Sequence, residues 1–201
     1  MSKKGIFIVI EGLDGSGKTT QANLLANKLS KTYSLLCTAE PSHGKIGTFI
    51  REGCLYEEKR LPTEAEALLF AADRIEHMKN EILPALDEGK LVICDRYVYS
   101  SLAYQGSAGL SVDWIKTINA RALEPDFAIF IDVPPERVLG RLRRQKSVME
   151  TLETQQKVRE VYMKYVEKGE LVLIDGDKPK NEVAEALYSK VLSLLKSINF
   201  Q

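Results

Sequence analysis

Short, uninterrupted apolar stretches recur along the chain and alternate with longer segments of helical periodicity. The stretches are continuous rather than alternating with polar residues, which is typical of strands buried on both faces of a sheet. Strands are predicted at Ile6–Glu11, Leu35–Thr38, Leu91–Cys94, Phe127–Val133 and Leu171–Ile174. Helices are predicted at Thr19–Lys31, Glu64–Glu88, Asp113–Ala122, Pro135–Lys146, Glu150–Lys168 and Asn181–Ser197, with Pro84 tightening or kinking the second. This alternation predicts an α/β fold whose five-stranded parallel sheet is covered by helices on both faces.

Composition narrows the class of protein. The 201 residues fit a single domain over 1–201. Lys+Arg and Asp+Glu both count 28, so no net charge favours nucleic acid or an anionic membrane as a partner. Apolar runs stay far below the roughly 18 residues of a membrane span, and no signal peptide is expected. Cys37, Cys54 and Cys94 are odd in number and widely spaced, as expected of reduced thiols in a cytoplasmic protein.

The loop after the first strand carries a phosphate-binding motif. It reads EGLDGSGKTT, in which Gly12, Gly17, Lys18 and Thr19 match G-x-x-x-x-G-K-[ST]. Glycines let backbone N–H groups converge on phosphate oxygens, the lysine reaches the β- and γ-phosphates, and the threonine offers a hydroxyl to Mg²⁺. The expected ATP-binding residues are Gly12, Leu13, Asp14, Gly15, Ser16, Gly17, Lys18, Thr19 and Thr20. The sequence lacks the Asn-Lys-x-Asp motif with which a GTPase reads its base.

A second polar stretch, ICDRYVYSSLAYQG, begins at the end of the third predicted strand. Asp95 can hold Mg²⁺ there, directly or through water, so Thr19 and Asp95 are the expected metal ligands. Arg96 can bind a phosphate with its planar guanidinium. The tyrosines, serines and glutamine that follow offer the stacking and hydrogen-bonding wall that a nucleoside needs. The plainer alternatives are that Asp95 only caps a helix and that Tyr97 and Tyr104 only pack, Tyr97 more so than Tyr104.

Three blocks, EGLDGSGKTTQ, LLFAADRIEH and DRYVYSSLAYQG, resemble the motif blocks of the thymidylate kinase family. The likeness extends from Ile6 to the C-terminal helix. It implies a P-loop NTPase fold with strand order 2-3-1-4-5 and a mobile lid at about residues 140–152. It also implies a homodimer that uses ATP and Mg²⁺ to phosphorylate dTMP to dTDP.

The resemblance implies roles for residues on the acceptor side. Phe70 would stack on thymine and Arg74 would hydrogen-bond the base, since their i, i+4 spacing puts them on one helix face. Arg96 would bind the acceptor phosphate, together with Arg51, which matches a bacterial arginine in its spacing from Glu40-Pro41. The plainer alternatives are a core position for Phe70 and an ion pair of Arg74 with Asp73 or Glu76.

Four further roles follow from the same resemblance. Tyr104 would press against the sugar C2′ and exclude a 2′-hydroxyl. Ser101 and Gln105 would read or flank the base. Asp14 would approach the 3′-hydroxyl or the magnesium shell.

The chain departs from the family pattern at two positions that bear on catalysis. Ala39 stands where bacterial members carry arginine, and Gly15 stands where the eukaryotic branch carries arginine. Phosphoryl transfer requires positive charge on the migrating group, so the lid segment PPERVLGRLRRQKSVME is expected to supply it. Arg141 and Arg144 are three apart on one helix face; the alternative is a solvated basic face. The expected catalytic residues are Lys18, Asp14, Arg96, Arg141 and Arg144.

Two other functions remain open from the residues alone. One is another (deoxy)nucleoside or nucleoside-monophosphate kinase of the same fold. The other is an ATP-dependent regulatory switch, although such a switch has no use for a second nucleotide pocket. His43 and His77 have no identifiable partner in the sequence.

Overall fold

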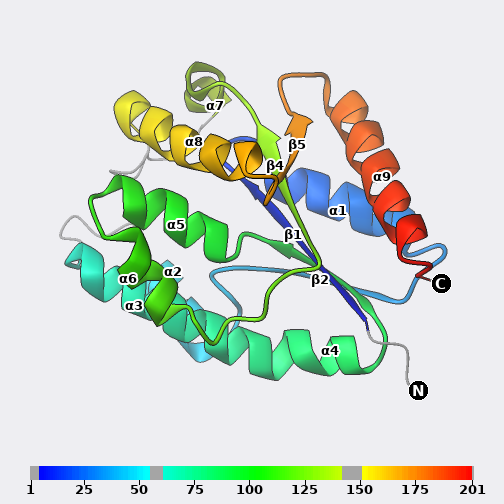
Figure 1. Cartoon of the computed structure of the whole chain (residues 1–201), viewed down its shortest axis with the longest axis horizontal. Helices are drawn as coiled ribbons and strands as arrows, with labels where there is room; N and C mark the ends of the chain where they lie inside the picture. Colours follow the sequence, from blue (N-terminus) through cyan, green and yellow to red (C-terminus); the bar gives the residue numbers. More distant parts are fainter. Residues whose placement is uncertain (1–4, 55–60, 142–150, 201) are drawn as a thin grey trace.

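One sheet of five parallel strands organises the chain, as seen in a computed structural model that describes residues 5–54, 61–141 and 151–200 (Figure 1). The strands are β1 (Ile6–Gly12), β2 (Leu35–Ala39), β3 (Leu91–Asp95), β4 (Phe127–Asp132) and β5 (Val172–Asp175). Their order is β2-β3-β1-β4-β5, so β1 lies at the centre. In its register, Ile10 pairs with Asp95 of β3 and Gly12 with Ile131 of β4. The predicted strands and their order are confirmed.

Helices cover both faces of the sheet (Figure 1). On one face, α1 (Lys18–Leu29) packs beside α9 (Lys180–Ser197). On the other face, α5 (Val98–Ser107) packs beside α8 (Leu152–Glu167), and α3 (Thr63–His77) lies next to α5. The remaining helical segments are α2 (Lys45–Gly53), η1 (Met78–Ile82), α4 (Leu83–Asp87), α6 (Val112–Ile118) and α7 (Pro135–Arg141).

The helix predicted over 64–88 is divided into three segments. After α3, one π-helical turn (η1) precedes α4. Pro84 lies in the first turn of α4, where the missing N–H of proline costs least. Two other helices, α2 and α5, were not predicted: α2 is only nine residues long, and in α5 serine, tyrosine and glycine obscure the periodicity.

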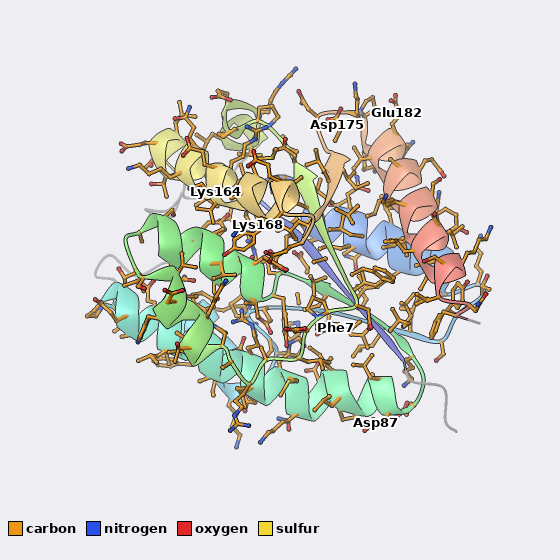
Figure 2. All side chains as sticks on the ribbon, viewed as in Figure 1. Phe7, Asp87, Lys164, Lys168, Asp175 and Glu182 are labelled. Atoms are coloured by element: carbon orange, nitrogen blue, oxygen red, sulfur yellow. The ribbon has the colours of Figure 1, made fainter. Side chains whose placement is uncertain are left out.

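The core is apolar and centres on β1, whose residues Phe7–Ile10 are fully buried. The ring of Phe7 meets that of Tyr97 edge-on, with ring centroids 5.0 Å apart. Tyr97 therefore packs in the core, which was the plainer alternative for this residue. By contrast, Asp87, Lys164 and Glu182 lie on the outer surface (Figure 2). None of the described helices is long and apolar enough to cross a bilayer.

Candidate active site

The loop between β1 and α1 has the backbone shape that its glycines predict. Gly17 precedes α1 with φ 89°, a left-handed conformation that favours glycine. A Cβ at Gly12 would lie 2.8 Å from the carbonyl oxygen of Ile131 on β4, so a side chain there would displace the loop. These two glycines therefore give the loop the backbone conformation that converging N–H groups need for phosphate binding.

Lys18 is buried within this loop, and its ammonium group donates a hydrogen bond of 2.7 Å to the carbonyl of Leu13. Burial, and then the charge of Arg96, lowers the pKa of Lys18 to about 8, while three neighbouring carboxylates act in the opposite direction. Around it, Leu13 and Ser16 are buried, whereas Thr20 is exposed. The lysine thus carries its charge at neutral pH and lies against the loop expected to hold the donor phosphates.

Thr19 and Asp95 meet across the sheet edge, as expected of a shared metal ligand pair. The Thr19 hydroxyl donates to Oδ2 of Asp95 at 2.5 Å. The other carboxylate oxygen, Oδ1, is buried and has no hydrogen-bond partner among the described residues. Because α5 has Tyr97 as its N-cap, Asp95 does not cap that helix.

These donors fit Mg²⁺, which accepts one or two protein oxygens and completes its shell with water and phosphate. Among the described residues, no group of three His, Cys, Asp or Glu side chains could form a protein cage for a metal. A hydroxyl and an unpartnered carboxylate oxygen beside a phosphate loop are the pattern expected of a magnesium–nucleotide site instead.

Arg96 links β3 to the phosphate loop. Its backbone is left-handed, with φ 73°, a strained conformation for a residue with a side chain. The guanidinium donates to the carboxylate of Asp14, to Gly12 O at 3.3 Å and to the hydroxyl of Ser100 at 3.0 Å. Burial raises the pKa of Asp14, but the charges of Arg96 and Lys18 outweigh it, so the net pKa is lowered. Both partners of this ion pair are therefore charged at neutral pH.

Glu11, which no sequence motif singled out, accepts hydrogen bonds that fix the residues around Arg96. Its fully buried carboxylate accepts from the backbone N–H of Tyr97 at 2.9 Å and from the hydroxyls of Ser100 at 2.6 Å and Tyr162 at 3.0 Å. Burial raises the pKa of Glu11 in spite of these hydrogen bonds. The only signal in the sequence was an acid directly before Gly12 at the end of an apolar strand.

Tyr104 joins the two polar stretches from the side of α5. Its hydroxyl accepts a hydrogen bond of 3.0 Å from the backbone N–H of Asp14, and the guanidinium of Arg96 lies 5.0 Å from its ring centroid. Burial and the nearby carboxylate of Asp14 raise the pKa of Tyr104, so the phenol remains neutral. The tyrosine expected to contact the sugar therefore lies beside the arginine expected to bind the acceptor phosphate.

Arg51 enters the site from α2. Its guanidinium donates to the carbonyl of Pro41 at 2.6 Å and to that of Ser42 in the loop after β2. The buried carboxylate of Asp73 on α3 holds the same loop by accepting from the Ser42 backbone N–H at 2.8 Å. Arg51 therefore bonds a loop that α3 also holds.

A cavity of about 500 Å³ connects the two polar stretches. Its walls include Asp14, Gly15, Gly17, Lys18, Thr19 and Thr20 on the phosphate-loop side, and Ala39, Glu40, Pro41, His43, Arg51, Asp95 and Arg96 on the other. Three cationic side chains, those of Lys18, Arg51 and Arg96, thus border one space with the expected metal ligands. An anionic group entering from either side would meet positive charge from both.

The residues expected around the base lie beyond these walls. Phe70 is half-buried on α3 and lies outside the core cluster of the described residues, contrary to the plainer alternative. One turn later, Arg74 is buried and hydrogen-bonds Ser101. Gln105 is buried, and its side-chain oxygen has no hydrogen-bond partner within the described chain.

The structure describes only part of the predicted lid. Arg141 is the last residue of α7, and the position of its side chain is not described. Arg144 and most of the segment 140–152 lie outside the described residues. The expected contribution of a lid arginine therefore remains a prediction from the sequence.

The central glycine loop, the 2-3-1-4-5 sheet and the acid at the neighbouring strand end define a P-loop nucleotide-binding fold of the kinase type. The sequence model described as "Thymidylate kinase" matches residues 10–187. The chain belongs to the thymidylate kinase family.

Curated relatives are similar in sequence to this chain over most of its length. A probable thymidylate kinase of Pyrococcus abyssi (strain GE5 / Orsay) is 45% identical over 197 residues, covering 94% of this chain and 96% of that protein. One from Pyrococcus horikoshii is 50% identical over 172 residues, covering 82% and 84%. One from Pyrobaculum aerophilum is 42% identical over 194 residues, covering 96% and 97%. Each of these is named a probable thymidylate kinase.

Proposed function

We propose that this protein transfers the γ-phosphoryl group of ATP to dTMP, giving ADP and dTDP. The observation that carries the proposal is the cavity shared by the phosphate loop and by Arg51 and Arg96. A nucleotide switch needs only the first of these two cationic sites. Two sites facing one space suit a donor and an acceptor phosphate that meet in line.

On the donor side, the loop amides and Lys18 would bind the β- and γ-phosphates of ATP. Thr19 and Asp95 would hold Mg²⁺, which supplies charge neutralisation at the β- and γ-oxygens when bound. Lys18 already lies against the carbonyl of Leu13, so the loop places its charge where a phosphate would accept it. The donor phosphoryl group would then point toward the cavity.

On the acceptor side, Arg96 and Arg51 would bind the phosphate of dTMP. Asp14 and Tyr104 keep Arg96 in place through the ion pair and the ring contact. Phe70, Arg74, Ser101 and Gln105 would then surround the base. Since phosphoryl transfer leaves little covalent chemistry to the protein, positioning and charge are the main contributions of these residues.

The exposed apolar residues of α2 and α3 support a homodimer. Phe49 on α2 is 54% exposed and Leu68 on α3 is 50% exposed, and these two helices pack together. A second copy that covered them would bury this apolar area. Analytical ultracentrifugation should give the mass of a dimer, and Phe49→Asp should shift the mass to that of a monomer.

A reducing compartment suits the three cysteines. Cys37, Cys54 and Cys94 are all within the described residues and form no disulfide with one another. Burial raises the pKa of Cys94 well above its ordinary value, so this thiol is unreactive. We therefore place the protein in the cytoplasm.

An ADP-release assay with one acceptor at a time tests the proposed activity. Turnover with dTMP should greatly exceed turnover with dCMP, UMP and thymidine. Preference for thymidine would identify a nucleoside kinase, and ATP turnover that is independent of any acceptor would identify a switch. Either result would contradict the proposal.

A further inference from the structure

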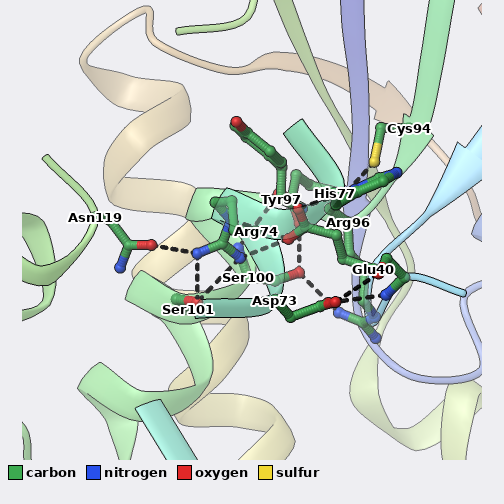
Figure 3. A network of polar contacts seen from close by, with 12 residues as sticks. Glu40, Asp73, Arg74, His77, Cys94, Arg96, Tyr97, Ser100, Ser101 and Asn119 are labelled. Carbon is green, nitrogen blue, oxygen red and sulfur yellow. Dashed lines mark hydrogen bonds and ion pairs between the residues drawn. The ribbon is translucent and has the colours of Figure 1, made fainter. Parts of the chain in front are cut away.

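The guanidinium of Arg74 is buried and donates hydrogen bonds to Glu40, Ser101 and Asn119 (Figure 3). On one side, Nε donates to Oε2 of Glu40 at 2.9 Å, and a terminal nitrogen lies 2.7 Å from the same oxygen. Both side chains are at most 3% exposed, so the pair is shielded from water. An arginine in such a pair cannot leave without stranding a buried carboxylate.

Asn119 holds a second side of the guanidinium. It follows the last residue of α6, and its side chain donates from Nδ2 to the carbonyl of Ile115 at 2.8 Å. That bond uses the amide nitrogen, so the amide oxygen is the atom that faces Arg74 and accepts from it. Since arginine only donates, this is the one orientation of the carboxamide that satisfies both partners.

Ser101 on α5 makes the weakest of the three contacts. Its hydroxyl lies 3.3 Å from each terminal nitrogen of Arg74, longer than the contacts to Glu40. The ring of Tyr97 flanks the guanidinium, with the Arg74 carbon 5.1 Å from the ring centroid. The Ser101 side is therefore the one at which a ligand atom can replace a protein acceptor at least cost.

We propose that Asn119 is a positioning residue for base selection in the acceptor site. Together with Glu40, it fixes Arg74 so that the side facing Ser101 presents N–H donors alone. A pyrimidine with a carbonyl at position 4 accepts such a bond, whereas the amino group at position 4 of cytosine is itself a donor. The inference rests on the proposed function, because it concerns the base of the acceptor nucleotide.

Two substitutions at one position test this assignment. Asn119→Leu keeps a similar volume but removes the acceptor, and it should lower kcat/KM for dTMP by about 10-fold to 100-fold, mainly through KM. The ratio of kcat/KM for dTMP to that for dCMP should fall by about tenfold. Asn119→Asp keeps an acceptor for Arg74, although it gives up the bond to the Ile115 carbonyl, and it should retain the wild-type ratio within about threefold. KM for ATP should be unchanged in both.

Thr117→Ala is the matched control on the same helix. The Thr117 hydroxyl donates to the carbonyl of Asp113 at 2.8 Å at an exposed position, so its removal perturbs α6 away from Arg74. With melting temperatures measured for each variant, this control should keep the wild-type base ratio. The assignment is overturned if Asn119→Leu keeps that ratio, or if both Asn119 variants lose it equally.

The wild-type enzyme separates this inference from the proposed function. If it prefers dUMP to dTMP, the proposed function fails, and the same variants still decide the role of Asn119 with dUMP as acceptor. If it prefers dCMP, the N–H donors of Arg74 would face the amino group of cytosine, which is also a donor. That result would overturn the inference as well.

Discussion

The guanidinium of Arg96 is ion-paired with the carboxylate of Asp14, which joins the end of β3 to the phosphate loop that follows β1. Arg96 takes a left-handed backbone conformation to do so, and its backbone N–H is hydrogen-bonded to Ile10 O at 2.9 Å. Strain of this kind persists where the surrounding structure fixes it, and it is common at functional sites. The ion pair thus places Arg96, the residue expected to bind the acceptor phosphate, directly beside the loop expected to bind the donor phosphates.

Replacing Arg96 should therefore damage acceptor use far more than ATP binding. Arg96→Lys keeps the charge but loses the planar fork, and we expect kcat/KM for dTMP to fall by about 100-fold or more. The affinity for ATP, measured by calorimetry, should change by less than about fivefold. Arg121→Ala, at an exposed arginine, is the control and should leave both values unchanged. Equal losses for both nucleotides would contradict the assignment.

The pKa of Lys18, lowered to about 8, predicts a pH-dependent affinity for ATP. The charged form binds phosphate and predominates below the pKa, so affinity should be lost as pH rises through about 8. The loss should approach about tenfold per pH unit above that value. Titration of binding between pH 7 and pH 9.5 tests this, and Lys18→Gln should bind weakly with a flat profile. A flat wild-type profile would count against the buried lysine.

Asp95→Asn should raise the Mg²⁺ requirement. The amide keeps one oxygen but loses the charge that would attract the cation, so the Mg²⁺ concentration for half-maximal rate should increase by about 10-fold to 100-fold. The measurement is the initial rate against Mg²⁺ at saturating ATP and dTMP. The exposed Asp87→Asn serves as control. An unaltered Mg²⁺ dependence in Asp95→Asn would remove this residue from the metal site.

Glu11→Ala should lower stability as well as activity. It leaves the backbone N–H of Tyr97 and the hydroxyls of Ser100 and Tyr162 without their shared acceptor. A buried donor that is left without an acceptor costs about 1–3 kcal/mol. The free energy of unfolding should therefore fall by at least about that amount. Urea denaturation measures it. The exposed Glu182→Ala should lose less than about 0.5 kcal/mol.

Phe70→Ala should raise KM for dTMP while kcat and the melting temperature change little. The ring is half-buried and lies outside the core cluster of the described residues, so its loss opens no core cavity. Stacking on a base contributes about 1–3 kcal/mol, which corresponds to roughly 5-fold to 150-fold in KM. Glu64→Ala, at an exposed position of the same helix, is the control. A large loss of melting temperature in Phe70→Ala would identify a packing residue.

The sheet could be predicted because its strands are continuous apolar runs, and the donor loop could be predicted because its motif is local. Helix α2 was missed because it is only nine residues long, and α5 was missed because its residues serve the site. In α5, Ser100, Ser101 and Tyr104 contact Glu11, Arg74 and Asp14, so polar groups fall where an apolar face would be expected.

The supporting residues were hidden for a different reason. Glu11, Asn119 and His77 act through partners that are distant in sequence. His77, for which the sequence offered no partner, lies 3.3 Å from Glu40 and 2.8 Å from the hydroxyl of Thr38. Such contacts follow from the strand order, which brings the loop after β2 against α3. No local sequence pattern predicts them.

Donor and acceptor phosphates are expected to meet in the cavity between Lys18 and Arg96. The most direct test is a crystal structure with dTMP, Mg²⁺ and a non-hydrolysable ATP analogue. We expect the dTMP phosphate within hydrogen-bonding distance of Arg96 and the γ-phosphate at Lys18, with thymine against Phe70. Density for dTMP outside this cavity, with Arg96 still bonded only to protein groups, would contradict the account.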